Sequence, residues 1–236
     1  MPLKIKPSSL PALLAATAAL NAPVHAGRPL ATEDAGLLEP RACELEAFVG
    51  RARERDAPRL DAASLQVGCG FGLRSQAALG VGRESAAGER SRSLGLSGKT
   101  GLRDGGDDAT SFALAWGLGA ADAPGTSMRL ETTYLTGVAT LPLGGALALH
   151  ANLGWSRSRS ASASTTGWAL ALEHAGESGI DVMGEVFGDD RDRRPWVQVG
   201  VRASLLPERL WLDASAGVQL WPARPKLLTV GVKLAF

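Results

Sequence analysis

The chain contains few of the residues on which metal and cofactor sites depend. Its 236 residues include three histidines and two cysteines, and aromatic residues make up 5% of the total. No cluster of histidine, cysteine and carboxylate residues has the spacing of a metal site. The sequence therefore predicts neither a metal nor a cofactor.

The chain also lacks an excess of charge of either sign. It has 25 Lys and Arg residues against 24 Asp and Glu residues. Proteins that bind nucleic acid usually carry a basic surface. We therefore expect no nucleic-acid partner.

No stretch beyond residue 26 approaches 18 uninterrupted apolar residues, which excludes an exported protein with transmembrane helices. The N-terminus does have the pattern of a secretory signal: two lysines, an apolar segment over 10–20, and Val24-His25-Ala26. We expect residues 1–26 to be a signal peptide that is cleaved before Gly27. Prolines within this region argue against the alternative, a soluble N-terminal helix.

The mature chain is instead dominated by a period of two. From 65 to 73, larger side chains stand at every odd position and Gln or Gly at every even one. We find twelve such segments, at about 42–52, 62–73, 75–84, 92–103, 109–120, 128–141, 145–156, 166–174, 179–188, 195–206, 209–221 and 225–236. Alternating segments of about 10 residues, separated by turn residues, are the signature of a transmembrane β-barrel.

The sequence therefore predicts an all-β fold, an antiparallel transmembrane β-barrel of about 12 strands over 42–236. A β-sandwich also alternates, but its strands average about 5–6 residues, and these segments are longer. The face turned away from lipid is mostly Gly, Ala and Ser, which suits the concave inside of a barrel. Residues 27–41 form an N-terminal segment that either folds into the lumen or extends into the periplasm.

The end of the chain points to a location. Apolar residues at alternate positions from Leu228 to Phe236 are expected to face lipid, and the last strand is expected to close on the first. A final strand ending in Phe236 resembles the signal that is read by the barrel assembly machinery of Gram-negative outer membranes. We therefore predict a bacterial outer-membrane location, with outer-membrane lipid, lipopolysaccharide and the assembly machinery as partners.

The tryptophans fit this orientation. If the first strand rises from the periplasm, five tryptophans lie toward the outer surface, where aromatic residues anchor at the headgroup level: Trp116, Trp155, Trp168, Trp196 and Trp221. Trp211 lies near the periplasmic rim and points inward.

Charged residues of both signs are predicted to face the lumen. They are Glu44, Glu46, Lys99, Arg129, Glu131, His150, Glu173, Glu185, Arg202, Asp213 and Lys233. We expect Lys233 to approach Glu44 or Glu46, and Arg202 to lie between Glu185 and Asp213. The charges either neutralise one another inside a narrow barrel or form a polar constriction that selects solutes.

The two cysteines are a candidate disulfide. With 51–61 as the first outer loop, Cys43 and Cys69 lie opposite each other on the first two strands. Leu45 then faces Val67, and Ala47 faces Leu65. Side chains directly opposite on paired strands are close enough to bond. The alternative is two small reduced side chains.

The sequence contains only weak matches to motifs for phosphate binding or catalysis. Gly95–Thr100 lacks the first glycine of a phosphate-binding loop, since that position is Ser93. His150 has no defined partners for nucleophilic catalysis in the sequence, so an enzyme is not expected. Arg157, Arg159 and the segment 188–194 lie in outer loops, where they either pair with lipopolysaccharide phosphates or are solvated.

Several motifs resemble the family named for the MetA pathway of phenol degradation. They are Arg28-Pro29-Leu30-Ala31-Thr32-Glu33-Asp34-Ala35-Gly36, Cys43-Glu44-Leu45-Glu46, Phe187-Gly188-Asp189-Asp190-Arg191, Pro207-Glu208-Arg209-Leu210, Leu212-Asp213-Ala214-Ser215 and the closing strand. The resemblance implies an outer-membrane barrel that acts as a transporter, with a link to aromatic compounds and no established catalytic residues. The chain departs from the family in being short and in having Glu33 where Asp is usual.

A barrel of twelve strands is intermediate in width between filled barrels and open channels. About eight strands give a barrel filled by its own side chains, and 16–18 give an open aqueous channel. We predict a narrow channel or transporter for small solutes, with aromatic compounds suggested by the resemblance. The alternative is a non-conducting structural or surface barrel.

Overall fold

The computed structural model describes residues 30–55, 57–106, 108–122, 125–192, 194–220 and 224–236. The predicted signal peptide and Trp221 lie outside these residues.

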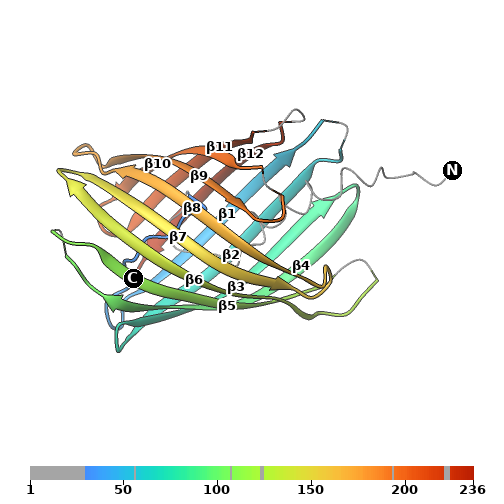
Figure 1. Cartoon of the computed structure of the whole chain (residues 1–236), viewed down its shortest axis with the longest axis horizontal. Coiled ribbons are helices and arrows are strands. Elements are labelled where there is room, and N and C mark those ends of the chain that lie inside the picture. Colours follow the sequence, from blue (N-terminus) through green and yellow to red (C-terminus); the bar gives the residue numbers. More distant parts are fainter. Residues whose placement is uncertain (1–29, 56, 107, 123–124, 193, 221–223) are drawn as a thin grey trace.

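The described chain forms one closed antiparallel barrel of twelve strands, as the alternation predicts (Figure 1). Each predicted segment corresponds to one strand, and β1 pairs with β12 to close the wall. The strands are β1 (Cys43–Arg53), β2 (Leu60–Gly72), β3 (Ser75–Ala86), β4 (Glu89–Arg103), β5 (Ser111–Ala121), β6 (Arg129–Gly144), β7 (Leu147–Ser158), β8 (Ala163–His174), β9 (Ile180–Asp189), β10 (Trp196–Leu206), β11 (Leu210–Gln219) and β12 (Lys226–Ala235).

The barrel has its polar side chains inside and its large apolar side chains outside. On β2, Leu65 and Val67 are 43% and 40% exposed, whereas Gln66 between them is 4% exposed. Ala113 and Ala115 on β5 are fully buried in the lumen. A soluble domain buries its large apolar side chains, so this inverted pattern fits a protein whose outer surface meets lipid.

No helix among the described residues is long and apolar enough to cross a membrane.

The β3–β4 hairpin shows how the sequence sets the turns. Ala87 and Gly88 are its two turn residues, with φ angles of 54° and 84°. Two successive positive φ angles are typical of the type I′ turn, whose twist matches that of the flanking strands. This tight turn places β3 and β4 in register over their whole length, including Arg83 opposite Arg92.

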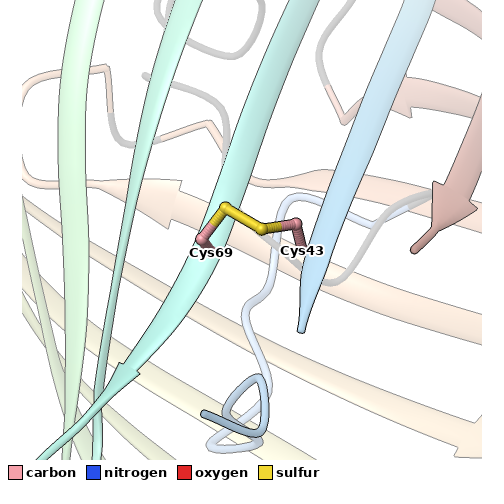
Figure 2. Close-up of a disulfide and its surroundings, with 2 residues drawn as sticks. All are labelled: Cys43 and Cys69. Carbon is pink, nitrogen blue, oxygen red and sulfur yellow. A yellow bond between two sulfur atoms is a disulfide. The ribbon is translucent and has the colours of Figure 1, made fainter. Parts of the chain in front are cut away.

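The predicted register of β1 and β2 is confirmed. Cys43 is opposite Cys69, Leu45 is opposite Val67, and Ala47 is opposite Leu65. The two cysteines form a disulfide with a Cα–Cα distance of 4.1 Å, which joins the start of β1 to the end of β2 (Figure 2).

The pairing of the first and last strands extends to the last residue of the chain. The Phe236 N–H donates to the Cys43 carbonyl at 2.9 Å, and the Cys43 N–H donates to the Phe236 carbonyl at 2.8 Å. The backbone of the last residue is therefore paired, while its ring is 67% exposed. The role of Phe236 in assembly stays a prediction.

Trp196 lies at the outer end of the wall, as expected for the start of β10, but its side chain is turned toward the lumen. Trp155 and Trp168 are 45% and 39% exposed, but Trp196 is 3% exposed. On β10 the even positions face the lumen: Gln198 is 3% exposed, whereas Val199 is 61% exposed. Trp196 has the parity of Gln198 and therefore points inward.

Candidate functional site

The lumen holds the segment of residues 30–41, which we call the plug segment (blue in Figure 1). Its first anchor is Glu185 on β9. The Ala31 N–H donates to Glu185 Oε1 at 2.8 Å, and the N–H and hydroxyl of Thr32 donate to Glu185 Oε2 at 2.9 and 2.6 Å. One inward carboxylate therefore satisfies two backbone donors and a hydroxyl.

A second anchor is Asn152 on β7. The Glu33 N–H donates to Asn152 Oδ1 at 2.7 Å, and Asn152 Nδ2 donates to the Glu33 carbonyl at 2.9 Å. A side-chain amide has both a donor and an acceptor, so it pairs with a backbone group as a neighbouring strand would. Asn152 is thus a site residue that the sequence analysis did not identify.

Three further strands bind the backbone of the plug segment. Thr140 Oγ1 on β6 accepts from the Ala35 N–H at 2.8 Å, and Gln76 Oε1 on β3 accepts from the Leu38 N–H at 2.7 Å. Lys99 Nζ on β4 donates to the Asp34 carbonyl at 3.0 Å. Buried backbone groups need such partners, and here the wall of the barrel supplies them.

Apolar contacts and small wall residues complete the fit. Leu30 packs with Ala171 and Met183, and Ala35 packs with Ala113, Ala115 and Val138. At Gly101, an added Cβ would lie 2.7 Å from Leu37 Cδ1. The small inward residues noted in the sequence therefore make room for a chain inside the barrel.

At its C-terminal end the plug segment joins the wall of the barrel. Pro40 forms an isolated parallel bridge with Gly70, and the Arg41 N–H donates to the Gly70 carbonyl at 2.8 Å. A Cβ at Gly70 would overlap the carbonyl oxygens of Leu38 and Glu39. The segment continues into β1 at Cys43, which the disulfide joins to Cys69 on β2. Its C-terminal end is therefore fixed to β1 and β2.

The predicted contact of Lys233 with two glutamates is present. Lys233 Nζ lies 2.5 Å from Glu44 Oε2 and 3.8 Å from Glu46 Oε1. Gln66 Nε2 donates to Glu46 Oε2 at 2.8 Å. Lys233 also lies over the inward ring of Trp211, 5.9 Å from its centroid. These contacts link β12, β1 and β2 across the closure of the barrel.

The predicted pairing of Arg202 with Glu185 is wrong. The register of β9 and β10 places Asp181 opposite Arg202, and Glu185 opposite Gln198. Arg202 Nη1 lies 3.7 Å from Asp181 Oδ2 and 3.2 Å from Glu173 Oε1. Its other expected neighbour, Asp213, is directly opposite on β11.

His150 belongs to a chain of hydrogen bonds. Its Nδ1 lies 3.0 Å from Thr140 Oγ1, and its Nε2 lies 3.2 Å from Glu173 Oε2. The order hydroxyl, imidazole and carboxylate is that of a catalytic triad. Here, however, the Thr140 oxygen already accepts from the Ala35 N–H of the plug segment. The network therefore connects the plug segment to Arg202 through His150 and Glu173.

Lys99 lies beside the acidic part of the plug segment. Its side chain is 4% exposed, and its Nζ lies 3.9 Å from Glu33 Oε2 and 3.8 Å from Asp34 Oδ1. A cavity of about 20 Å³ beside it is lined by Glu33, Glu44 and Gln66 among others. That volume holds about one water molecule.

Arg129 and Glu131 lie at the outer rim of the lumen, where Arg129 is opposite Ala121. The β5–β6 register shifts between Gly119 and Ala120, which places an extra residue in β6 at Glu131. The Glu131 carboxylate binds the β7–β8 turn through Ser158 Oγ and Ser160 Oγ at 2.7 and 2.6 Å. Arg129 is exposed.

The outer end of the lumen contains a buried cluster of apolar side chains. Trp196 stacks on Phe187, with ring centroids 6.2 Å apart and an interplanar angle of 5°. Ala52, Leu60, Ala62 and Leu227 form one buried cluster with Trp196, and Phe48 packs against it. We call this set the aromatic cluster. The plug segment and the aromatic cluster thus fill different heights of the lumen.

Among the described residues, no group of three or more His, Cys, Asp or Glu side chains is arranged to hold a metal ion.

The barrel is similar to solved outer-membrane channels and porins. The COG4313 outer membrane channel of Pseudomonas putida F1 matches with a TM-score of 0.60 at 14% identity, covering 90% of this chain and 100% of that chain. The NanC porin matches with a TM-score of 0.58 at 7% identity, covering 80% and 98%. The KdgM porin matches with a TM-score of 0.57 at 10% identity, covering 81% and 99%. The chain therefore has the fold of bacterial outer-membrane β-barrels, and its apolar exterior fits a lipid bilayer.

No curated protein matches the sequence. A family model does match it, over residues 13–236, and its description is Uncharacterised conserved protein UCP029691. The match spans almost the whole chain, so the protein belongs to this family.

Proposed function

We propose that the protein is a narrow outer-membrane channel for small solutes that the plug segment closes in the state described here. The observation that carries this proposal is how the plug segment is held. Its backbone binds inward polar side chains from five strands, β3, β4, β6, β7 and β9. The wall of the barrel is therefore a polar surface that exchanges hydrogen bonds with whatever occupies the lumen.

The hydrogen bonds that hold the plug segment are weak enough to break while the strand pairing of the barrel stays intact. An intramolecular hydrogen bond contributes about 0.5–1.5 kcal/mol net, because water replaces it when it breaks. The strands, in contrast, are held by a continuous antiparallel ladder that closes on itself. Displacement of the plug segment exposes Glu185, Asn152, Thr140 and Gln76 to water and to solute.

Single-channel recording in planar bilayers tests the proposal. Asn152→Ala removes both hydrogen bonds to the Glu33 backbone, and we expect more frequent or larger openings than in the wild type. Ser215→Ala is the matched control, because Ser215 faces the lumen and binds Thr229 at 2.7 Å instead of the plug segment. Folded protein that passes no current, either as wild type or as Asn152→Ala, would refute the channel.

The aromatic cluster favours a second candidate, a non-conducting structural barrel. It packs at the outer end of the lumen and contains no residue of the plug segment. The variant Trp196→Ala separates the two candidates: in a channel it increases the current of Asn152→Ala, and in a structural barrel it lowers stability while current stays absent.

Aromatic compounds are the solutes that we propose to test first. The resemblance to the phenol-degradation family suggests them, and inward rings line the lumen at Trp196, Phe187 and Trp211. Flat apolar solutes stack on such rings. Uptake of labelled phenols and of sugars of equal size into vesicles that contain the protein compares the two classes. Equal rates for both would argue against aromatic selectivity.

We also propose that the protein is not an enzyme. Similar structures include porins and a channel, and the Ala35 N–H of the plug segment donates to the hydroxyl oxygen of the Thr140–His150–Glu173 chain. Ester hydrolysis by the detergent-solubilised protein, lost on His150→Ala, would contradict this proposal.

A further inference from the structure

The outer end of the barrel wall carries a basic cluster on the lipid-facing side of β3 and β4. We define it as Arg83, Arg90 and Arg92, with Ser85 between them. Arg83 is directly opposite Arg92, and Ser85 is directly opposite Arg90. The three arginines have the parity of exposed apolar residues on the same strands and are themselves exposed.

Apolar residues continue this face toward the centre of the membrane. Val81 and Leu79 precede Arg83 at successive outward positions of β3, and they are 53% and 61% exposed. Leu94 and Leu96 follow Arg92 on β4 and are 50% and 38% exposed. Two residues span about 7 Å of strand, so the basic cluster lies one step above the apolar belt.

The charges of the basic cluster are poorly balanced by protein groups. Like charges directly opposite on neighbouring strands repel each other. Asp122 binds Arg92 through Nε and Nη2 at 2.8 and 2.7 Å. None of the ion pairs seen among the described residues involves Arg83 or Arg90. The nearby carboxylate of Asp61 is shared by Arg51 and Arg59 at 2.7 and 2.8 Å.

We propose that the basic cluster binds the phosphorylated glucosamine headgroup of lipid A, the membrane part of lipopolysaccharide. This inference rests on the proposed outer-membrane location. A phosphate between Arg83 and Arg90 accepts charge-assisted hydrogen bonds from both guanidinium groups and relieves their repulsion. The acyl chains of the same molecule then lie along Val81, Leu79, Leu94 and Leu96. A free phosphate gains the first set of contacts and not the second.

The test is a binding titration on the folded, detergent-solubilised protein, freed of lipopolysaccharide. The probes are bisphosphorylated lipid A, dephosphorylated lipid A and inorganic phosphate. For wild type we expect the bisphosphorylated probe to bind at least about tenfold more tightly than either of the others. Dephosphorylated lipid A lacks the charge-assisted contacts, and inorganic phosphate lacks the acyl chains that lie along the apolar residues. For Arg83→Gln/Arg90→Gln we expect that preference to disappear.

The matched control is Arg103→Gln/Arg209→Gln, which removes the same charge from exposed arginines at the opposite end of the wall, at the end of β4 and before β11. We expect it to bind bisphosphorylated lipid A within about threefold of wild type, because surface charges away from the site act weakly. Equal losses in the two double variants would overturn the assignment to this cluster, and so would full displacement by inorganic phosphate. If Arg83→Gln/Arg90→Gln loses lipid A binding but conducts like wild type, the channel proposal is unaffected. If wild type binds lipid A but passes no current, the channel is refuted and the lipid A site still stands.

Discussion

At the scale of single residues, the lumen depends on carboxylates that are almost completely buried. Glu44 and Glu46 are 3% and 2% exposed, and Lys233 is their shared cation. A buried charge that loses its partner costs about 3–5 kcal/mol. Lys233 itself is about a third exposed, so water in the lumen screens part of that cost.

We therefore expect Lys233→Ala to lower the free energy of unfolding by about 3 kcal/mol, at the low end of that range. Urea unfolding of the protein in lipid vesicles measures the change. Lys226→Ala is the control, since Lys226 is an exposed residue of the same strand, and it should change stability by no more than about 0.5 kcal/mol. Equal effects of the two substitutions would show that Glu44 and Glu46 do not need Lys233.

The charged lumen residues could be predicted from the sequence better than the neutral ones. Alternation places Glu185 and Lys99 inward, and the structure places both there. Alternation also places Asn152 and Gln76 on the lumen side of their strands. A neutral amide, unlike a charged residue, does not stand out in a sequence as a candidate site residue. Their role appears only once the plug segment lies beside them, because both bind its backbone.

At the scale of elements, the twelve strands could be predicted because a lipid-facing strand repeats with a period of two. The alternation is interrupted where a strand contains an extra residue. The extra residue at Glu131 breaks the alternation of β6, and a shift of one residue moves a side chain to the other face. On β10, Trp196 has the parity of Gln198, and both side chains are buried in the lumen.

Gly70 determines how the plug segment enters the wall. An alanine there would overlap the Leu38 and Glu39 carbonyls, so we expect Gly70→Ala to displace residues 37–41 while the barrel still closes. Such overpacking costs about 1–3 kcal/mol. Hydrogen exchange at the Leu38 amide should become faster. In Gly184→Ala, the new Cβ meets nothing within 4 Å, so exchange there should match wild type. Unchanged exchange in Gly70→Ala would mean that the segment is not held as described.

The beginning of β4 is tied to the β5–β6 loop by the contacts of Arg92 with Asp122. The backbone N–H and the guanidinium of Arg92 donate to its carboxylate and hold the pKa of Asp122 below its usual range. A depressed pKa means that this stabilisation is complete above the ordinary pKa of an aspartate, about 3.9. It is lost as the pH falls through the lower value in the folded protein.

We accordingly expect faster hydrogen exchange at the Arg92 amide as the pH falls from about 4, the ordinary pKa of an aspartate, through the lower pKa of Asp122 in the folded protein. Asp122→Asn should show the faster exchange, corrected for intrinsic rates, at every pH. A wild-type amide that stays equally protected down to pH 2 would contradict the role given to this carboxylate.

At the scale of the whole molecule, the fold separates two tasks. The outside of the closed wall is a belt of exposed apolar residues, and the inside is a polar surface occupied by the protein's own N-terminal segment. The sequence predicts the closed wall from local alternation. It left the position of residues 27–41 open, because contacts between residues more than 100 positions apart, such as Thr32 with Glu185, have no local pattern.

The most direct test of the account fixes the plug segment in place and measures current. Ala35 and Val138 pack in one buried cluster, so Ala35→Cys/Val138→Cys offers a disulfide between the plug segment and β6. We expect this variant to pass no current in planar bilayers when oxidised and to open after reduction. Wild type treated with the same reductant controls for the Cys43–Cys69 disulfide. Equal current from the oxidised and reduced variant, with the new disulfide verified by mass spectrometry, would contradict the account.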